Sequence, residues 1–125
     1  MSNANQQQRE EIPRSAWREA LELMTKEHEG DEVTIEVVGR DLGDQEEAAK
    51  LPLNYLEYDP KDDVVVIGVG GHSARFPVIL RHMIHRPRTI GVHPPAPATT
   101  RSVLMVDPDG VETIVTLHRL PELPG

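Results

Sequence analysis

Between residues 12 and 30, mainly apolar residues recur at the spacing of one face of an α-helix. Pro13 suits the first turn of a helix and Ser15 is a good N-cap. Gly30 stands where a helix commonly ends on a left-handed residue, so the pattern predicts a helix that ends just before it. The buried stripe recurs at i, i+3, i+4, i+7 and i+11 and consists of Trp17, Ala20, Leu21, Met24 and His28.

Most of the remaining chain alternates apolar and polar residues or carries short apolar runs, as β-strands do. Residues 40–53 interrupt this pattern, and we interpret them as a polar connection with a turn at Gly43. Two hairpins are predicted to turn at DPKDD and at DPDG, which are rich in turn-forming residues. The predicted strands are 32–39, 54–58, 64–69, 88–93, 102–106 and 111–120.

The segment from Phe76 to His85 fits two periods. A helical spacing and a strand alternation both account for its apolar residues, so both structures stay open. Pro77 fits the first turn of a helix and Pro87 would end it, which favours a short helix or helical turn.

These elements predict an α+β fold. We expect the N-terminal helix to pack on a mainly antiparallel, strongly curved five- or six-stranded sheet or on a small barrel. The 125 residues have the length of one domain. We assign residues 1–11, which are polar and Gln-rich, to a disordered arm, residues 12–120 to a single α+β domain, and residues 121–125 to a tail.

The chain resembles a family of small bacterial proteins of unknown function, through motifs that run in order from about Glu11 to Arg119. It departs from that pattern at Asp31, where the resemblance leads us to expect an aromatic residue. The resemblance implies one small domain and brings no activity, cofactor or catalytic residue with it. The motifs are Ile12-Pro13 with Trp17, His28-Glu29-Gly30, Glu36-Val37-x-Gly39-x-Asp41-x-Gly43-x-Gln45, Leu51-Pro52-Leu53, His82-x-Ile84-x-x-Pro87-x-x-Ile90, and Asp109-Gly110 with Thr113.

Composition excludes several classes of protein. The chain has no cysteine, which excludes disulfides, thiolate catalysis and zinc sites built on cysteine. No run approaches the roughly 18 apolar residues of a membrane helix, and the N-terminus lacks the apolar region of a signal peptide. We therefore expect a bacterial, cytoplasmic protein. Its core has few aromatics, with one Trp, one Phe and two Tyr, and we expect a homodimer to add stability.

Charge is distributed unevenly along the chain. Residues 1–63 carry 17 Asp and Glu against 7 Lys and Arg, a net of −10, whereas residues 64–125 carry a net of +2. The overall net charge of −8 argues against broad nucleic-acid binding. No carboxylate lies between Asp63 and Asp107, and every basic residue there is an arginine, which favours contacts with carboxylates or other anions. These arginines are Arg75, Arg81, Arg86, Arg88 and Arg101.

Four histidines lie in the same carboxylate-free window and raise the alternative of a metal site. His82 and His85 share a face in a helix but point to opposite faces in a strand. Nearby arginines would repel a divalent cation, which counts against a site. The four candidate ligands are His72, His82, His85 and His93.

An anion site is a further alternative, because Gly68, Gly70 and Gly71 follow an apolar strand, with Ser73 and Arg75 beyond them. The segment has neither the P-loop lysine nor the dinucleotide fingerprint. Ser73 beside His72 lacks the elbow and the third residue of a hydrolase triad.

We expect a non-enzymatic accessory or regulatory binding module without a cofactor. Its arginines would supply fixed donors to an acidic protein partner or to a second copy, and its histidines would gain charge in mildly acidic solution. The binding residues we predict are Arg75, Arg81, His82, His85, Arg86 and Arg88.

Overall fold

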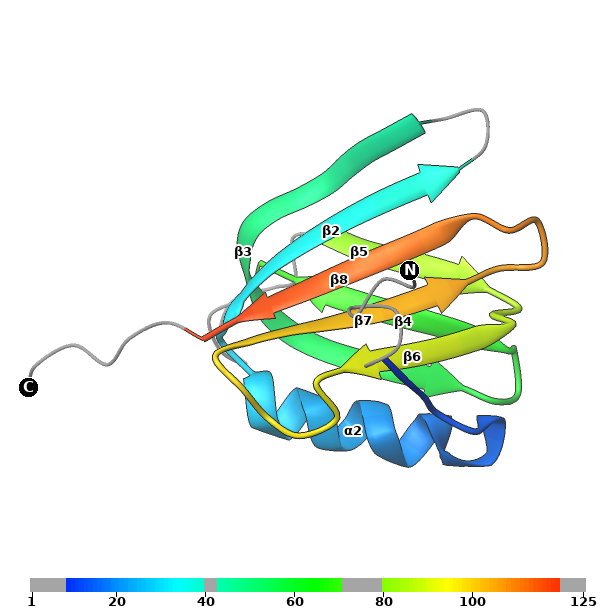
Figure 1. Ribbon diagram of the computed structural model, residues 1–125, viewed down its shortest axis with the longest axis horizontal. Helices are drawn as coiled ribbons and strands as arrows, with labels where there is room; N and C mark the ends of the chain where they lie inside the picture. Colours follow the sequence, from blue (N-terminus) through cyan, green and yellow to red (C-terminus); the bar gives the residue numbers. More distant parts are fainter. Residues whose placement is uncertain (1–8, 40–42, 71–79, 120–125) are drawn as a thin grey trace, which may run out of the picture.

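The computed structural model of the chain describes residues 9–39, 43–70 and 80–119 (Figure 1). Within these ranges, a short strand and one α-helix precede seven further strands, and the strands are antiparallel wherever they pair. The elements are β1 (Glu10–Glu11), η1 (Arg14–Ala16), α2 (Trp17–His28), β2 (Glu32–Gly39), β3 (Gly43–Asp59), β4 (Val64–Val69), β5 (Leu80–His85), β6 (Thr89–His93), β7 (Thr100–Val106) and β8 (Glu112–His118).

The predicted helix is confirmed as α2, and Gly30 ends it with a φ of +87°. Its start is different from the prediction. A 3₁₀ turn occupies residues 14–16, so the α-helix proper begins at Trp17 with Ala16 as its N-cap. No side chain caps it, and the assignment of Ser15 as N-cap was wrong.

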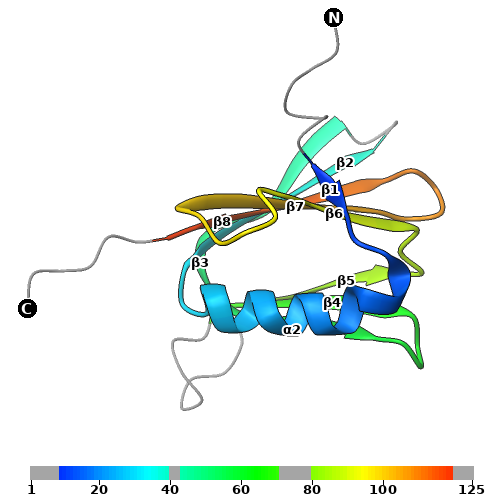
Figure 2. The same ribbon diagram turned by 60° about the horizontal axis from the view of Figure 1, so that its bottom comes forward.

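The described strands form one open sheet in the order β1-β6-β7-β8-β2-β3-β4-β5. The mixed helix-and-sheet class is confirmed. Five or six strands was too few, and the barrel was wrong, because β1 and β5 at the two ends of the described sheet do not pair with each other. Figure 2 shows β6, β7 and β8 as one layer and β4 and β5 as the other, with α2 along one side of the space that the core side chains fill.

β3 joins the two layers. Its residues up to Pro52 pair with β2, and its residues from Leu53 to Asp59 pair with β4. The direction changes around Lys50, which has a φ of +54°. A single long strand therefore belongs to both halves of the sheet, and this lets the sheet fold over itself without closing.

The core lies between the two layers and under α2. Trp17 and Leu21 of the helix belong to one buried apolar cluster with Ile35 of β2, Ile67 of β4 and Met105 of β7. Every second side chain of a strand points to this inner face, and the alternating burial of residues along β2, β7 and β8 follows this rule.

Three sequence predictions need correction. Residues 43–53 are not a polar connection, because they belong to β3: residues up to Pro52 pair with β2, and Leu53 pairs with β4. Leu80–His85 is a strand rather than a helical turn, since β4 offers it a full ladder of partners; residues 71–79 lie outside the described residues. Glu10 and Glu11, expected in the disordered arm, pair with β6 as β1.

Candidate functional site

Most of the arginines and histidines that the sequence singles out lie on β5 and on the turn after it. β5 is the last strand of the described sheet, so its outer edge has no described neighbour. Alternation exposes Arg81, Met83 and His85 on one face. We call Arg81, Met83, His85, Arg86 and Arg88 the basic edge.

The turn after β5 is held by its backbone. The Arg86 N–H donates to the carbonyl oxygen of Asp63 at 2.7 Å, and the Arg88 N–H donates to that of Val106 at 2.7 Å. Arg14 donates to the carbonyl oxygen of Pro87 at 2.8 Å. The turn is therefore fixed on three sides, while the side chains of Arg86 and Arg88 stay exposed.

The candidate metal ligands do not converge among the described residues. His82 faces the core side of β5, opposite Ile67 of β4, whereas His85 faces outward. His93 ends β6, near the other end of the sheet order. No group of three His or acidic side chains in the described ranges is arranged to hold a metal ion, and His72 lies outside those ranges.

The described glycines of the candidate anion loop serve the sheet. Gly68 lies in β4, where the ring of Tyr55 crosses it so closely that a Cβ would stand 2.5 Å from Tyr55 Cε2. The Tyr55 hydroxyl accepts a hydrogen bond from Arg81 Nε at 3.1 Å. The Gly70 N–H donates to the carbonyl oxygen of Pro52 at 2.8 Å and is thus occupied. Gly71, His72, Ser73 and Arg75 lie outside the described residues.

A second polar group, which the sequence did not indicate, gathers around the β3–β4 turn. The Tyr58 hydroxyl donates to Asp63 Oδ1 at 2.7 Å, and Arg14 Nη1 lies 3.2 Å from the same oxygen. The Arg14 guanidinium also stacks over the ring of Trp17, 4.3 Å from its centroid. The ring of Tyr58 meets Trp17 edge to face. We call Arg14, Tyr58 and Asp63 the tyrosine cluster.

The tyrosine cluster is electrostatically tuned. Burial raises the pKa of Tyr58, and its hydrogen bond to Asp63 acts in the same direction. The hydrogen bond from Tyr58 lowers the pKa of Asp63, with Arg14 and Arg86 contributing further. The cluster therefore keeps Tyr58 as a neutral donor and Asp63 as an ionised acceptor over a wide pH range.

Two strained residues support the same place. Asp63 and Arg86 have φ angles of +52° and +50°, which non-glycine residues adopt at a cost of about 1–3 kcal/mol each. The hydrogen bond between their backbones joins the β3–β4 turn to the end of β5. Strain of this kind concentrates at functional sites.

An open groove runs between α2 and β3 beside the tyrosine cluster. Its larger part has a volume of about 650 Å³, within the range of known ligand sites. An adjoining hollow of about 500 Å³ reaches Arg14 and Asp63. Arg18, Tyr58 and Pro60 line both parts, so we treat them as one, the helix groove.

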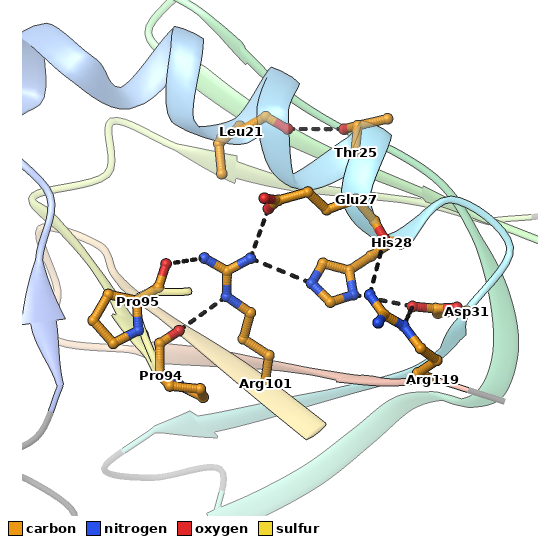
Figure 3. A network of polar contacts seen from close by, with 9 residues as sticks. All are labelled: Leu21, Thr25, Glu27, His28, Asp31, Pro94, Pro95, Arg101 and Arg119. Atoms are coloured by element: carbon orange, nitrogen blue, oxygen red, sulfur yellow. Dashed lines mark hydrogen bonds and ion pairs between the residues drawn. The ribbon is translucent and has the colours of Figure 1, made fainter. Parts of the chain in front are cut away.

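A buried polar network ties the end of α2 to β7 (Figure 3). Arg101 is 4% exposed and donates Nε–H to the carbonyl oxygen of Pro94 at 2.9 Å and Nη1–H to Glu27 Oε1 at 2.9 Å. It also donates to the carbonyl oxygen of Pro95. Its Nη1 lies 3.3 Å from Nε2 of His28, which is fully buried. This arginine of the carboxylate-free window thus pairs with the acidic half of the chain.

Asp31 completes the network at the position where the sequence departs from the expected aromatic. Its Oδ2 lies 3.0 Å from His28 Nδ1 and 3.9 Å from Arg119 Nε. Since Arg101 can only donate, His28 accepts through Nε2 and donates through Nδ1. Arg101 and His28 lie buried at the centre of the network, while Glu27, Asp31 and Arg119 reach toward solvent at its rim. We call this network the clamp.

Sequence reasoning missed the tyrosine cluster and the clamp for different reasons. Arg14 and Tyr58 are 44 positions apart, and no local pattern joins them. Arg101 did carry a signal, because it shares its strand face with Val103 and Met105, both fully buried. An arginine in phase with core residues of a strand needs buried partners.

Residues 8–125 match the family of unknown function DUF5335, and the chain belongs to this family. It is also similar to an uncharacterized protein of Aquifex aeolicus (strain VF5), with 33% identity over 113 residues that cover 90% of this chain and 95% of the relative. No solved structure matches the chain. Within the described ranges, no helix is long and apolar enough to cross a membrane.

Proposed function

We propose that this protein is a non-enzymatic binding module whose basic edge docks an acidic protein strand. One observation carries the proposal. β5 leaves its outer edge without a described neighbour while exposing arginine and histidine side chains beside it. Exposed edge strands are places where another chain can add a strand.

The chemistry of the basic edge favours carboxylates. Arg81 and Arg86 offer planar donor groups that match a carboxylate in two hydrogen bonds, and Arg88 adds a third charge. Met83 is 49% exposed between them and supplies an apolar contact. Long-range attraction between the arginines and an acidic partner would speed association at low salt.

A second copy of the chain is the first partner to test. Residues 43–50 of β3 pair with β2 alone in the described sheet, so no described strand lies along their other edge. This segment reads GDQEEAAK and is acidic. The same fold therefore offers one basic and one acidic strand edge, which can meet in a heterologous contact between copies.

The experiment measures the oligomeric state by analytical ultracentrifugation at low and high salt. We expect wild type to associate at low salt, and Arg81→Ala/Arg86→Ala/Arg88→Ala to weaken association about tenfold or more, as does added salt. The variant Arg18→Ala/Lys26→Ala/Lys61→Ala removes the same charge elsewhere and should associate like wild type.

Charge exchange identifies the acidic side of the contact. Glu46→Lys/Glu47→Lys and Arg81→Glu/Arg86→Glu should each fail to self-associate but should associate when mixed. If wild type stays monomeric, an acidic partner is sought by pull-down from native lysate. Equal capture by wild type and the triple alanine variant would overturn the proposal.

A further inference from the structure

Along the edge of β3 that faces α2, the backbone N–H and C=O groups of Leu53 and Leu56 have hydrogen-bond partners before the strand reaches the helix groove. The Leu53 N–H donates to the carbonyl oxygen of Asp31 at 2.8 Å, and its own carbonyl oxygen accepts from the Gly30 N–H at 2.9 Å. The Leu56 N–H donates to Thr25 Oγ1 at 2.8 Å. The Thr25 proton is shared between the carbonyl oxygens of Leu56 and Leu21, each 2.9 Å away.

Tyr58 comes next on this edge. In an antiparallel pair, every second residue turns its N–H and C=O away from its neighbour strand. Leu56 and Tyr58 oppose Ile67 and Val65 in an unbroken register with β4. Since Leu56 directs its peptide groups toward α2, Tyr58 directs its own the same way, into the helix groove.

None of the hydrogen bonds among the described residues satisfies these peptide groups of Tyr58 on the α2 side. Its hydroxyl, in contrast, is held by Asp63. Tyr58 lines both parts of the groove, so its backbone donor and acceptor are presented at the groove wall. Strand-edge backbone groups that have no described partner can pair with a peptide that supplies a carbonyl and an N–H at strand spacing.

We propose that the helix groove binds an extended peptide segment of a partner protein, which adds to β3 at Tyr58. The peptide would accept from the Tyr58 N–H and donate to the Tyr58 carbonyl oxygen. Pro60, which is exposed and lines both parts of the groove, offers apolar surface to the side chains of the peptide. The site is distinct from the basic edge and does not depend on the function proposed for that edge.

The tyrosine cluster has a clear part in this site. It fixes the side chain of Tyr58 through Asp63 and Arg14, so the backbone beside the groove is held in place before a peptide arrives. Preorganisation of this kind lowers the entropic cost of binding. Thr25 sets one end of the site. Its hydroxyl is already hydrogen-bonded to the N–H and the carbonyl oxygen of Leu56, so a peptide cannot pair with β3 at Leu56.

Amide hydrogen exchange of the free protein tests the first step. We expect the Tyr58 amide to exchange about tenfold faster or more than the Leu56 amide, although both lie in β3. Equal protection of the two amides would overturn the inference, because Tyr58 would then already have a partner.

Random linear peptides displayed on phage and selected on the full-length protein provide the probe for the second step. Synthetic copies of enriched peptides are measured on wild type, Glu22→Trp and Glu19→Trp. Both substitutions are at exposed positions of α2, but only Glu22 lines the groove. We expect Glu22→Trp to weaken binding about tenfold or more and Glu19→Trp to leave it within about twofold.

Main-chain pairing is tested on the peptide itself. N-methylation along the peptide should abolish binding at the position that donates to Tyr58, and the bound peptide should protect the Tyr58 amide from exchange. The inference fails if no peptide is enriched, if Glu22→Trp and Glu19→Trp bind alike, or if N-methylation is tolerated at every position.

Discussion

Replacement of Arg101 by methionine tests whether the clamp between α2 and β7 stabilises the fold. The substitution keeps most of the buried volume but removes every donor from the network. Glu27 and His28 would lose their arginine partner, and His28 is fully buried. The carbonyl oxygens of Pro94 and Pro95 would lose it as well.

The cost follows from what is left unpaired. Removing one member of a buried ion pair destabilises a protein by about 3–5 kcal/mol. Such a loss is a large part of the free energy of unfolding of a typical domain, which is roughly 5–15 kcal/mol. For a chain of this length it should lower Tm by roughly 10–20 °C. Arg119→Met is the matched control, because Arg119 is 49% exposed and contacts Asp31 at 3.9 Å, and it should cost at most about 1 kcal/mol.

Urea unfolding at neutral pH, followed by circular dichroism, measures both variants. A loss below about 1 kcal/mol for Arg101→Met would refute the clamp, because an exposed arginine gives that much. The double variant Glu27→Gln/Arg101→Met adds a check. The loss in free energy of unfolding of this double variant should be about 1–3 kcal/mol smaller than the sum of the losses of Glu27→Gln and Arg101→Met, because the glutamine leaves no unpaired charge beside the methionine.

Two further predictions concern the tyrosine cluster and Gly68. Burial raises the pKa of Tyr58 above 10.0 in the folded protein. The neutral Tyr58 hydroxyl therefore contributes to the stability of the fold below about pH 10, and this contribution is lost as pH rises through the pKa of Tyr58 in the folded state. The hydrogen bond from Tyr58 lowers the pKa of Asp63 below 3.8 in the folded protein. The ionised Asp63 carboxylate therefore contributes to stability above about pH 4, and this contribution is lost as pH falls through the pKa of Asp63 in the folded state. In urea unfolding across pH, Tyr58→Phe should therefore flatten the alkaline decline and Asp63→Asn the acid decline, and unchanged profiles would contradict the cluster. Gly68→Ala should cost about 1–3 kcal/mol by displacing the Tyr55 ring, and Gly68→Ala/Tyr55→Ala should show no added loss from the alanine at 68.

The elements that sequence predicts well are those with local signals. The stripe from Trp17 to His28 needs no partner to be read as a helix, and Gly30 marks its end. The DPDG turn between β7 and β8 likewise carries its own chemistry, since Asp107 Oδ1 accepts from the backbone of Asp109 and Val111.

The failures are segments whose structure depends on distant partners. The residues GDQEEAAK have little intrinsic preference for strands, and the backbone of β2 holds them in β3. Leu80–His85 satisfies two periods equally, and only the ladder with β4 decides between them. The site could not be assembled from sequence, because Arg14, Tyr58 and Asp63 meet only after β3 and β4 have turned back onto α2.

Two hydrogen bonds join the helix groove to the turn after β5: the Arg86 N–H donates to the Asp63 carbonyl oxygen, and Arg14 donates to the carbonyl oxygen of Pro87. Asp63 holds Tyr58 on the groove side, and Arg86 belongs to the basic edge. Both residues have left-handed backbones, and the hydrogen bond between them holds the two strained positions together. The tyrosine cluster and the turn that presents Arg86 and Arg88 are therefore connected through hydrogen bonds of Asp63 and Arg14.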